Sequence, residues 1–191
     1  MTSDTDILSG CVRQQPKAQR ELFDKYGASL LGICMRYAAS REEAEDVLQE
    51  GFVKIFNNIT AFKGEGSLMA WMRRIVINTA ITHYHRTLKH RYHSDISVVK
   101  EREFDEPYFG ESDFTHEELW KVIQSMPDGY RMVFCLYAID GYKHREIADL
   151  MKIDENTSKS QYSRARRWLQ ERLLAIQKEK TTRPVGETGP L

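Results

Sequence analysis

The stretch AEDVLQEGFVKIF, residues 44–56, contains the pattern that decides the fold of the N-terminal half of the chain. Its apolar residues recur every three or four positions, which is the spacing of one buried face of an α-helix. Asp46, Gln49 and Glu50 fall on the opposite face at positions i, i+3 and i+4, where side chains are neighbours. The stretch therefore predicts an amphipathic helix that carries a compact, exposed acidic patch.

Charge is distributed unevenly along a chain whose bulk composition is ordinary. The protein has 191 residues, of which 41% are hydrophobic and 29% charged, and its formal net charge is zero. Residues 63–102 contain eight bases and three acids, residues 103–118 contain seven acids and no Lys or Arg, and residues 159–178 contain six bases and one acid. Two basic blocks separated by an acidic one suggest two surfaces that meet polyanions.

The sequence also indicates a cytosolic location. The start, MTSDTDILSG, has no basic and apolar segments of a secretory signal, and no apolar run approaches the ~20 residues that cross a bilayer. Cys11, Cys34 and Cys135 are far apart and form no CxxC motif, so we expect reduced, partly buried thiols.

Nearly all of the chain is predicted to be helical, because no segment sustains a period of two. Helices are expected at about 17–39, at 41–57 after an N-cap at Ser40, and at about 68–86 after an N-cap at Ser67. Periodicity is lost in the acidic segment from 94 to 115 and returns from His116 onward. The prediction is an all-α protein with two small helical domains, 1–93 and 116–178, a flexible acidic linker, 94–115, and a disordered tail, 179–191.

The segment HREIADLMKIDENTSKSQYSRARRWL, residues 144–169, has the pattern of a helix, a short turn and a second helix. We expect Thr157 or Asn156 to cap the second helix, and the side chains of this helix separate into two faces. The inward face is Ser158, Tyr162, Ala165 and Leu169, and the outward face is Lys159, Ser160, Ser163, Arg164 and Arg167. Hydroxyl groups and arginines at a helix N-terminus suit major-groove readout, although a basic, solvated helix end is the simpler alternative.

Two stretches in this order resemble the extracytoplasmic-function (ECF) class of sigma factors, in the bacterial housekeeping-sigma superfamily. Residues 21–86, which contain EDVLQEGFVKIF and AFKGEGS, are similar to the region 2 domain of that family. Residues 126–169, which contain the helix–turn–helix pattern, are similar to its region 4 domain. The resemblance implies an alternative sigma factor that binds RNA polymerase core and directs promoter-specific initiation.

The resemblance also implies roles for particular residues of the first domain. The acid, glutamine and acid with which the family docks on a coiled coil of the polymerase β′ subunit fall on Asp46, Gln49 and Glu50. Recognition of the minus-10 element, where DNA is melted, would fall on Phe62, Lys63, Arg73, Arg74, Asn78 and Arg86. Trp71 could either pack in the core or stack on a base, and core packing is favoured because Trp71 shares an apolar spacing with Leu68 and Ile75.

In the second domain, the resemblance assigns recognition of the minus-35 element to the second helix of the motif. The residues concerned are Thr157, Lys159, Ser160, Ser163, Arg164, Arg166 and Arg167, with Arg166 and Arg167 nearer the DNA backbone. The chain has Ser158 and Gln161 where the family has an apolar residue and an arginine. A promoter sequence therefore cannot be carried over from relatives.

The resemblance implies as partners the polymerase core, through its β′ and β subunits, promoter DNA and an anti-sigma factor, and it implies no cofactor and no small-molecule substrate. The protein would be cytoplasmic, associated with the nucleoid when active, or held at the inner membrane by the anti-sigma factor. The acidic linker either occupies a basic polymerase channel that later takes RNA or only keeps the chain solvated.

Parts of the sequence are also compatible with two other functions. An enzyme or metal site would have to use the four histidines between His83 and His93, but His83 and His85 point in different directions on a helix and have no supporting acid or cysteine cluster. We therefore expect no catalytic residues and no metal. A stand-alone helix–turn–helix regulator would need a dimer seam or a ligand pocket, and it would footprint DNA without polymerase.

Overall fold

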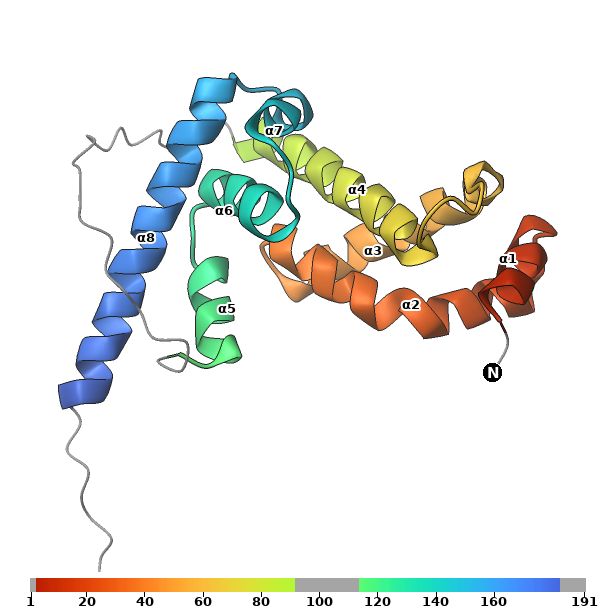
Figure 1. Cartoon of the computed structure of the whole chain (residues 1–191), viewed down its shortest axis with the longest axis horizontal. Helices are drawn as coiled ribbons and strands as arrows, with labels where there is room; N and C mark the ends of the chain where they lie inside the picture. Colours follow the sequence, from red (N-terminus) through yellow and green to blue (C-terminus); the bar gives the residue numbers. More distant parts are fainter. Residues whose placement is uncertain (1–2, 92–113, 183–191) are drawn as a thin grey trace, which may run out of the picture. The chain divides into compact units, whose positions relative to one another are not determined.

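The computed structural model describes residues 3–91 and 114–182, and all of the regular structure in these two ranges is helical (Figure 1). They divide into two compact units, one built from α1 to α4 and the other largely from α5 to α8. The predicted all-α class and the two helical domains are confirmed. Residues 94–113 of the predicted linker and residues 183–191 of the predicted tail lie outside the described residues. Residues 179–182, which were expected to be disordered, instead form the end of the last helix, Glu155–Thr182, so this part of the prediction is wrong. No helix in the described ranges is both long enough and apolar enough to cross a membrane.

The first unit contains α1 (Asp4–Val12), α2 (Pro16–Tyr37), α3 (Arg41–Asn57), a 3-10 turn η1 (Ile59–Ala61) and α4 (Leu68–Arg91). Helices α2, α3 and α4 pack against one another, and α1 packs on α2. Their common core includes Leu22, Leu30, Ile55 and Met72, all of which are fully buried. Burial of each such side chain contributes about 1.5–3 kcal/mol, so the amphipathic faces hold the three long helices together.

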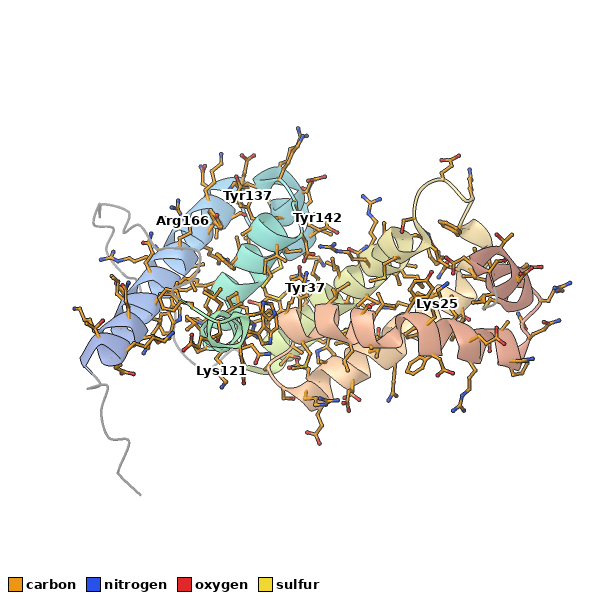
Figure 2. The ribbon with its side chains drawn as sticks, turned by 60° about the horizontal axis from the view of Figure 1, so that its bottom comes forward. Lys25, Tyr37, Lys121, Tyr137, Tyr142 and Arg166 are labelled. Atoms are coloured by element: carbon orange, nitrogen blue, oxygen red, sulfur yellow. The ribbon has the colours of Figure 1, made fainter. Side chains whose placement is uncertain are left out.

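Helix α1 was not predicted, and tertiary contacts explain why it forms. It has only nine residues, too few for a stable isolated helix. Asp4 accepts hydrogen bonds from Lys25 Nζ at 2.6 Å and from Tyr26 Oη at 2.9 Å, both on α2; Lys25 is labelled in Figure 2. Gly10 lets the two helices approach closely, since a Cβ at this position would lie 2.4 Å from the Cβ of Ala18.

Local capping sets the start of α3 as the sequence predicted. The Ser40 hydroxyl accepts a hydrogen bond from the Glu43 backbone N–H at 3.2 Å, and the Glu43 carboxylate accepts one from the Ala39 N–H. These contacts satisfy backbone donors that an α-helix leaves unpaired at its N-terminus. Helix α4 begins after Ser67, also as predicted, but it continues to Arg91, five residues beyond the expected end at Arg86.

The second unit contains α5 (His116–Gln124), α6 (Asp128–Phe134), a π-helical segment η2 (Cys135–Ile139), α7 (His144–Met151) and α8 (Glu155–Thr182). Thr115 and Glu118 form a reciprocal capping box at the start of α5. The Arg131 guanidinium, which is 4% exposed, pairs with Asp128 at 2.9 Å and donates to the Gln124 carbonyl, tying α6 to the end of α5.

The turn between α7 and α8 differs from the prediction at the start of the second helix. Lys152 adopts a left-handed φ of 55° in the turn, and α8 begins at Glu155. Thr157 and Asn156 therefore lie inside the first turn, and their expected capping role is wrong. The Asp154 carbonyl, which precedes the helix, accepts the first helical hydrogen bond from the Ser158 N–H at 3.0 Å.

Candidate functional site

The exposed face of α3 carries the predicted acidic patch. Asp46 and Gln49 are exposed, and within the described part of the chain neither has a hydrogen-bond or ion-pair partner. Val53, one turn further along the same face, is 58% exposed. The helix therefore presents a carboxylate, an amide and an apolar side chain to an outside partner.

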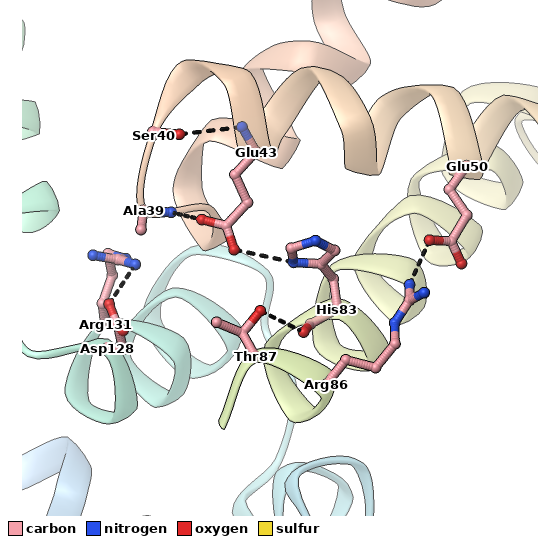
Figure 3. A network of polar contacts seen from close by, with 9 residues as sticks. All are labelled: Ala39, Ser40, Glu43, Glu50, His83, Arg86, Thr87, Asp128 and Arg131. Carbon is pink, nitrogen blue, oxygen red and sulfur yellow. Dashed lines mark hydrogen bonds and ion pairs between the residues drawn. The ribbon is translucent and has the colours of Figure 1, made fainter. Parts of the chain in front are cut away.

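Glu50 differs from its two neighbours because both of its carboxylate oxygens are engaged. Lys54 Nζ lies 2.9 Å from Oε1. Arg86 Nη2 of α4 lies 2.5 Å from Oε2, and this second contact is drawn in Figure 3. Partial burial raises the pKa of Glu50, but the hydrogen bonds from Lys54 and Arg86 outweigh this effect and hold the pKa below its usual range. Glu50 is thus an ionised carboxylate at neutral pH.

A second side-chain contact joins the same two helices nearer the start of α3. His83 Nδ1 of α4 lies 3.0 Å from Oε1 of Glu43 (Figure 3). The other carboxylate oxygen of Glu43 accepts the hydrogen bond from the Ala39 N–H at the start of α3. His83 therefore has a structural partner. The side chains of His90 and His93 lie outside the described residues. In the two described ranges, no group of three or more His, Cys, Asp or Glu is arranged to hold a metal ion.

Helix α4 gathers several of the predicted minus-10 residues on one exposed stripe. Arg74, Asn78 and Arg86 are all exposed and follow one another along the helix surface. Lys63 is exposed in the loop before the helix, whereas Phe62 and Arg73 are partly buried. The structure brings Arg74, Asn78 and Arg86 together and leaves Arg73 on a different side of the helix.

Trp71 is not a core residue, contrary to the expectation. It is only partly buried, and its ring lies 5.6 Å from the ring of Phe62, centroid to centroid. The buried series in this part of α4 is Leu68, Met72 and Val76, which shares Leu68 with the expected series but has Met72 and Val76 in place of Trp71 and Ile75. Two neighbouring sets of apolar residues on α4 could have faced the core, and only packing against α2 and α3 decides which set is buried. Trp71 therefore joins the exposed stripe beside Asn78.

The outward face of α8 is partly as predicted. Lys159 and Ser163 are exposed, whereas Thr157, Ser160, Arg164, Arg166 and Arg167 are partly buried. Lys159 pairs with Glu155 at 2.7 Å and Arg167 pairs with Glu171 at 3.2 Å, each with a residue four positions away. The Arg164 Nε is buried without a hydrogen-bond partner. Arg164 lies toward the flank of the helix, on the side of Gln161 and Trp168.

The inward face of α8 contains a polar contact that sequence reasoning missed. Ser158 is fully buried, and its hydroxyl lies 3.0 Å from Nδ1 of His144 on α7. The His144 ring stacks on Tyr137 with centroids 4.2 Å apart, and Tyr162 packs against both rings. Tyr137 is labelled in Figure 2. The histidine satisfies the buried serine, which explains how a hydroxyl is accommodated at an inward position.

Burial and the nearby charge of Lys159 lower the pKa of His144, so its imidazole is neutral at pH 7.

The three cysteines are free and buried. Burial raises the pKa of Cys34 to about 12, so this thiol stays protonated and unreactive. The exposed polar and charged residues described above lie on α3, α4 and α8, and these helices carry the candidate binding surfaces.

Comparison with known families gives the same division of the chain. The family described as Sigma-70 region 2 matches residues 22–89, and the family described as Sigma-70, region 4 matches residues 116–169. Both matches lie in the expected order and together cover more than half of the chain. The chain belongs to the ECF sigma factors. As an alternative sigma factor it directs promoter-specific transcription by RNA polymerase.

Curated sigma factors match this one over almost their whole length. The RNA polymerase sigma-H factor of Pseudomonas aeruginosa is 27% identical over 187 residues, covering 92% of this chain and 96% of the relative. The ECF RNA polymerase sigma-E factor of Escherichia coli (strain K12) is 28% identical over 174 residues, covering 86% and 91%. The stand-alone regulator is therefore not favoured.

A solved structure supports the fold. The sigma factor RpoE from Bartonella quintana, crystallised in complex with the anti-sigma factor NepR, is 20% identical and aligns with a TM-score of 0.50. The alignment covers 82% of this sigma factor and 96% of the solved chain.

Proposed function

We propose that this sigma factor docks on the β′ subunit of core polymerase through the exposed face of α3, with Asp46, Gln49 and Glu50 as the polar contacts. The observation that carries the proposal is the pair of exposed, unpartnered groups on Asp46 and Gln49. An open carboxylate one turn from a second ionised carboxylate suits arginines of a partner helix, because charge-assisted hydrogen bonds to carboxylates are strong.

The α4 stripe next to this face is proposed to hold the melted minus-10 strand. Asn78 would hydrogen-bond a base edge, and Arg74 and Arg86 would contact phosphates, with Lys63 and Arg73 adding positive charge. Phe62 and Trp71, whose rings are in contact, offer aromatic faces to unstacked bases.

The outward face of α8 is proposed to read the minus-35 element. Lys159, Ser160, Ser163 and Arg164 would reach base edges, and Thr157, Arg166 and Arg167 would lie nearer the backbone. The proposed functional boundaries are 1–93 for the polymerase and minus-10 domain and 116–178 for the minus-35 domain. We assign the protein no catalytic activity of its own, a cytoplasmic and nucleoid location when active, and an anti-sigma factor as inhibitor.

Charge reversal on α3 tests the docking proposal. Asp46→Arg is expected to weaken binding to core polymerase by at least about tenfold, because close like charges at an interface cost several kcal/mol. Asp24→Arg, an identical charge change at an exposed position of α2, is the matched control. Core affinity is measured by fluorescence titration beside the helical circular dichroism of each variant. Unchanged core affinity in a folded Asp46→Arg variant removes the docking assignment.

A further inference from the structure

Helix α1 contacts more of the first unit than α2. It also packs against η1, the 3-10 turn that follows α3 (Figure 1). Ile7 and Cys11 of α1 and Ile59 of η1 are all buried, so apolar side chains are present on both sides of this contact. None of the binding roles proposed above involves α1, although it lies against the turn that leads into the minus-10 residues.

A polar contact fastens the start of α1 to α2. Asp4 accepts the hydrogen bonds from Lys25 Nζ at 2.6 Å and from Tyr26 Oη at 2.9 Å. The hydrogen bond from Lys25, and then that from Tyr26, lowers the pKa of Asp4, so its carboxylate is ionised at neutral pH. The side chains of Asp4 and Lys25 are 46% and 42% exposed, which makes the contact a modest one. A helix of nine residues is not stable alone, so even a modest contact influences its position.

The turn η1 fixes the first residue of the loop that precedes α4. The Phe62 N–H donates a hydrogen bond to the carbonyl of the buried Ile59 at 3.2 Å. The Phe62 ring lies 5.6 Å from the ring of Trp71, centroid to centroid. A 3-10 turn of three residues has little stability of its own, so its position depends on the elements it packs against, which include α1 and α3. A contact at α1 is thus connected to Phe62 through Ile59.

The remainder of this loop, residues 63–67, is exposed at every position. Gly64 and Gly66 have left-handed φ values of 78° and 83°, and nothing lies within 4 Å of a Cβ placed on either residue. At its far end the Ser67 hydroxyl accepts a hydrogen bond from the Ala70 N–H at the start of α4, at 3.4 Å. The loop is therefore positioned from its two ends, and Phe62 belongs to the end that η1 holds.

We propose that α1 positions the minus-10 loop, residues 62–67: held on α2 by Asp4, α1 fixes η1 and thereby keeps the Phe62 ring beside Trp71, where the two rings receive an unstacked base. The inference rests on the proposed function and adds positioning residues to it. Asp4, Lys25 and Tyr26 act through Phe62 and do not touch DNA. Without their contact α1 moves on α2, Phe62 samples more positions, and binding of the base must restrict it again.

The first experiment measures the rate of promoter opening by the full-length chain bound to core polymerase. The fluorescence of 2-aminopurine in the minus-10 element reports the unstacked base. Asp4→Ala is expected to slow opening by roughly two- to fivefold, the effect of losing a partly exposed ion pair and one hydrogen bond. Asp6→Ala is the matched control, because Asp6 lies in the same first turn but bonds to Ser3 and not to α2. It should leave the opening rate unchanged, and core affinity should be unchanged in both variants.

A double-mutant cycle tests whether the contact itself is responsible. Tyr26→Phe removes only the hydroxyl that donates to Asp4, and it should slow opening in the wild-type chain. In the Asp4→Ala background the hydroxyl has no acceptor left, so Tyr26→Phe should have no further effect. Additive effects of the two substitutions would show that Asp4 and Tyr26 act separately, and would overturn the inference.

A third measurement follows the loop in the free chain, without polymerase or DNA. With Trp120 and Trp168 replaced by phenylalanine, Trp71 is the only tryptophan, and its emission depends on the cover that Phe62 provides. Asp4→Ala should shift this emission to longer wavelength, toward the value of Phe62→Ala, whereas Asp6→Ala should not. Circular dichroism shows that the rest of the chain remains folded in each variant.

The outcomes separate this inference from the function on which it rests. Normal promoter opening by Phe62→Ala contradicts the proposed role of the loop, and the role of α1 with it. Slow opening by Phe62→Ala together with normal opening by Asp4→Ala overturns the role of α1 alone. Equal slowing by Asp4→Ala and Asp6→Ala, or an unchanged Trp71 emission in Asp4→Ala, overturns it as well.

Discussion

Replacement of Gly51 by alanine tests the close approach of α3 and α4 that supports both proposed binding faces. A Cβ at Gly51 would lie 3.1 Å from Cγ2 and 3.8 Å from Cα of Val76 on α4. Val76 is fully buried, so its side chain has no open space into which to turn. Overpacking of this kind typically costs about 1–3 kcal/mol.

The cost is partly offset by helix propensity, and a second glycine measures that offset. Alanine is favoured over glycine inside a helix by about 1 kcal/mol. Gly32 lies in the interior of α2, is exposed, and has nothing within 4 Å of the position of a Cβ. Gly32→Ala should therefore stabilise the first unit by about 0.5–1 kcal/mol. Gly51→Ala should be less stable than Gly32→Ala by about 1–3 kcal/mol.

The assay is urea unfolding of the first unit, followed by tryptophan fluorescence. The chain has three tryptophans, and Trp71 is the one in the first unit. Replacing Trp120 and Trp168 by phenylalanine leaves Trp71 as the reporter, and the two glycine variants are compared in that background. If Gly51→Ala stabilises the unit as much as Gly32→Ala does, the contact with Val76 relaxes without cost and the reasoning is refuted.

Three further predictions concern DNA recognition and pH. Asn78→Ala should impair promoter melting, measured by permanganate footprinting, more than initial promoter binding; normal melting with poor initial binding would contradict its assignment to an unpaired base. Arg164→Ala should relax base preference at one minus-35 position, at a cost of about 1–3 kcal/mol in binding free energy. Arg167→Ala should instead weaken binding to all promoter sequences about equally and lower the slope of log affinity against log salt concentration by about one. Titration of single-base promoter variants at several salt concentrations distinguishes the two outcomes. Because the pKa of His144 is lowered in the folded chain, the unfolded chain binds a proton at this histidine more readily. The second unit should therefore lose stability as pH falls from about 7 through the usual histidine pKa near 6.5 and on to the lower folded value. Urea midpoints followed at Trp168 should fall with pH in this way, and the same pH dependence in His144→Phe would assign the effect to other groups.

Glu50 and Arg86 illustrate why the candidate sites were only partly predictable. Each was correctly expected to be accessible on its own helix, because the face of a helical residue follows from the spacing of its apolar neighbours. Their ion pair joins residues 36 positions apart, and no local pattern specifies which charged side chains of two packed helices will meet. Ser158 and His144 are a second example of a contact that the sequence does not predict. In the sequence the serine only replaces an apolar residue, and the structure shows that it contacts a histidine of the neighbouring helix.

The sequence by itself determined the all-helical class, the cap at Ser40, the acidic face of α3 and the family. These properties depend on interactions within about one turn, or on motifs that are contiguous in the chain. Only the tertiary structure decided that α1 forms, that Trp71 lies outside the core, and that α8 begins at Glu155. The first two depend on contacts between helices, of Asp4 with α2 and of Met72 and Val76 with the core in place of Trp71, whereas the start of α8 was visible only once the backbone hydrogen bond from Ser158 to Asp154 was known. A chain with a 3.6-residue period can bury either of two neighbouring stripes, and the packing free energy of the whole unit selects between them.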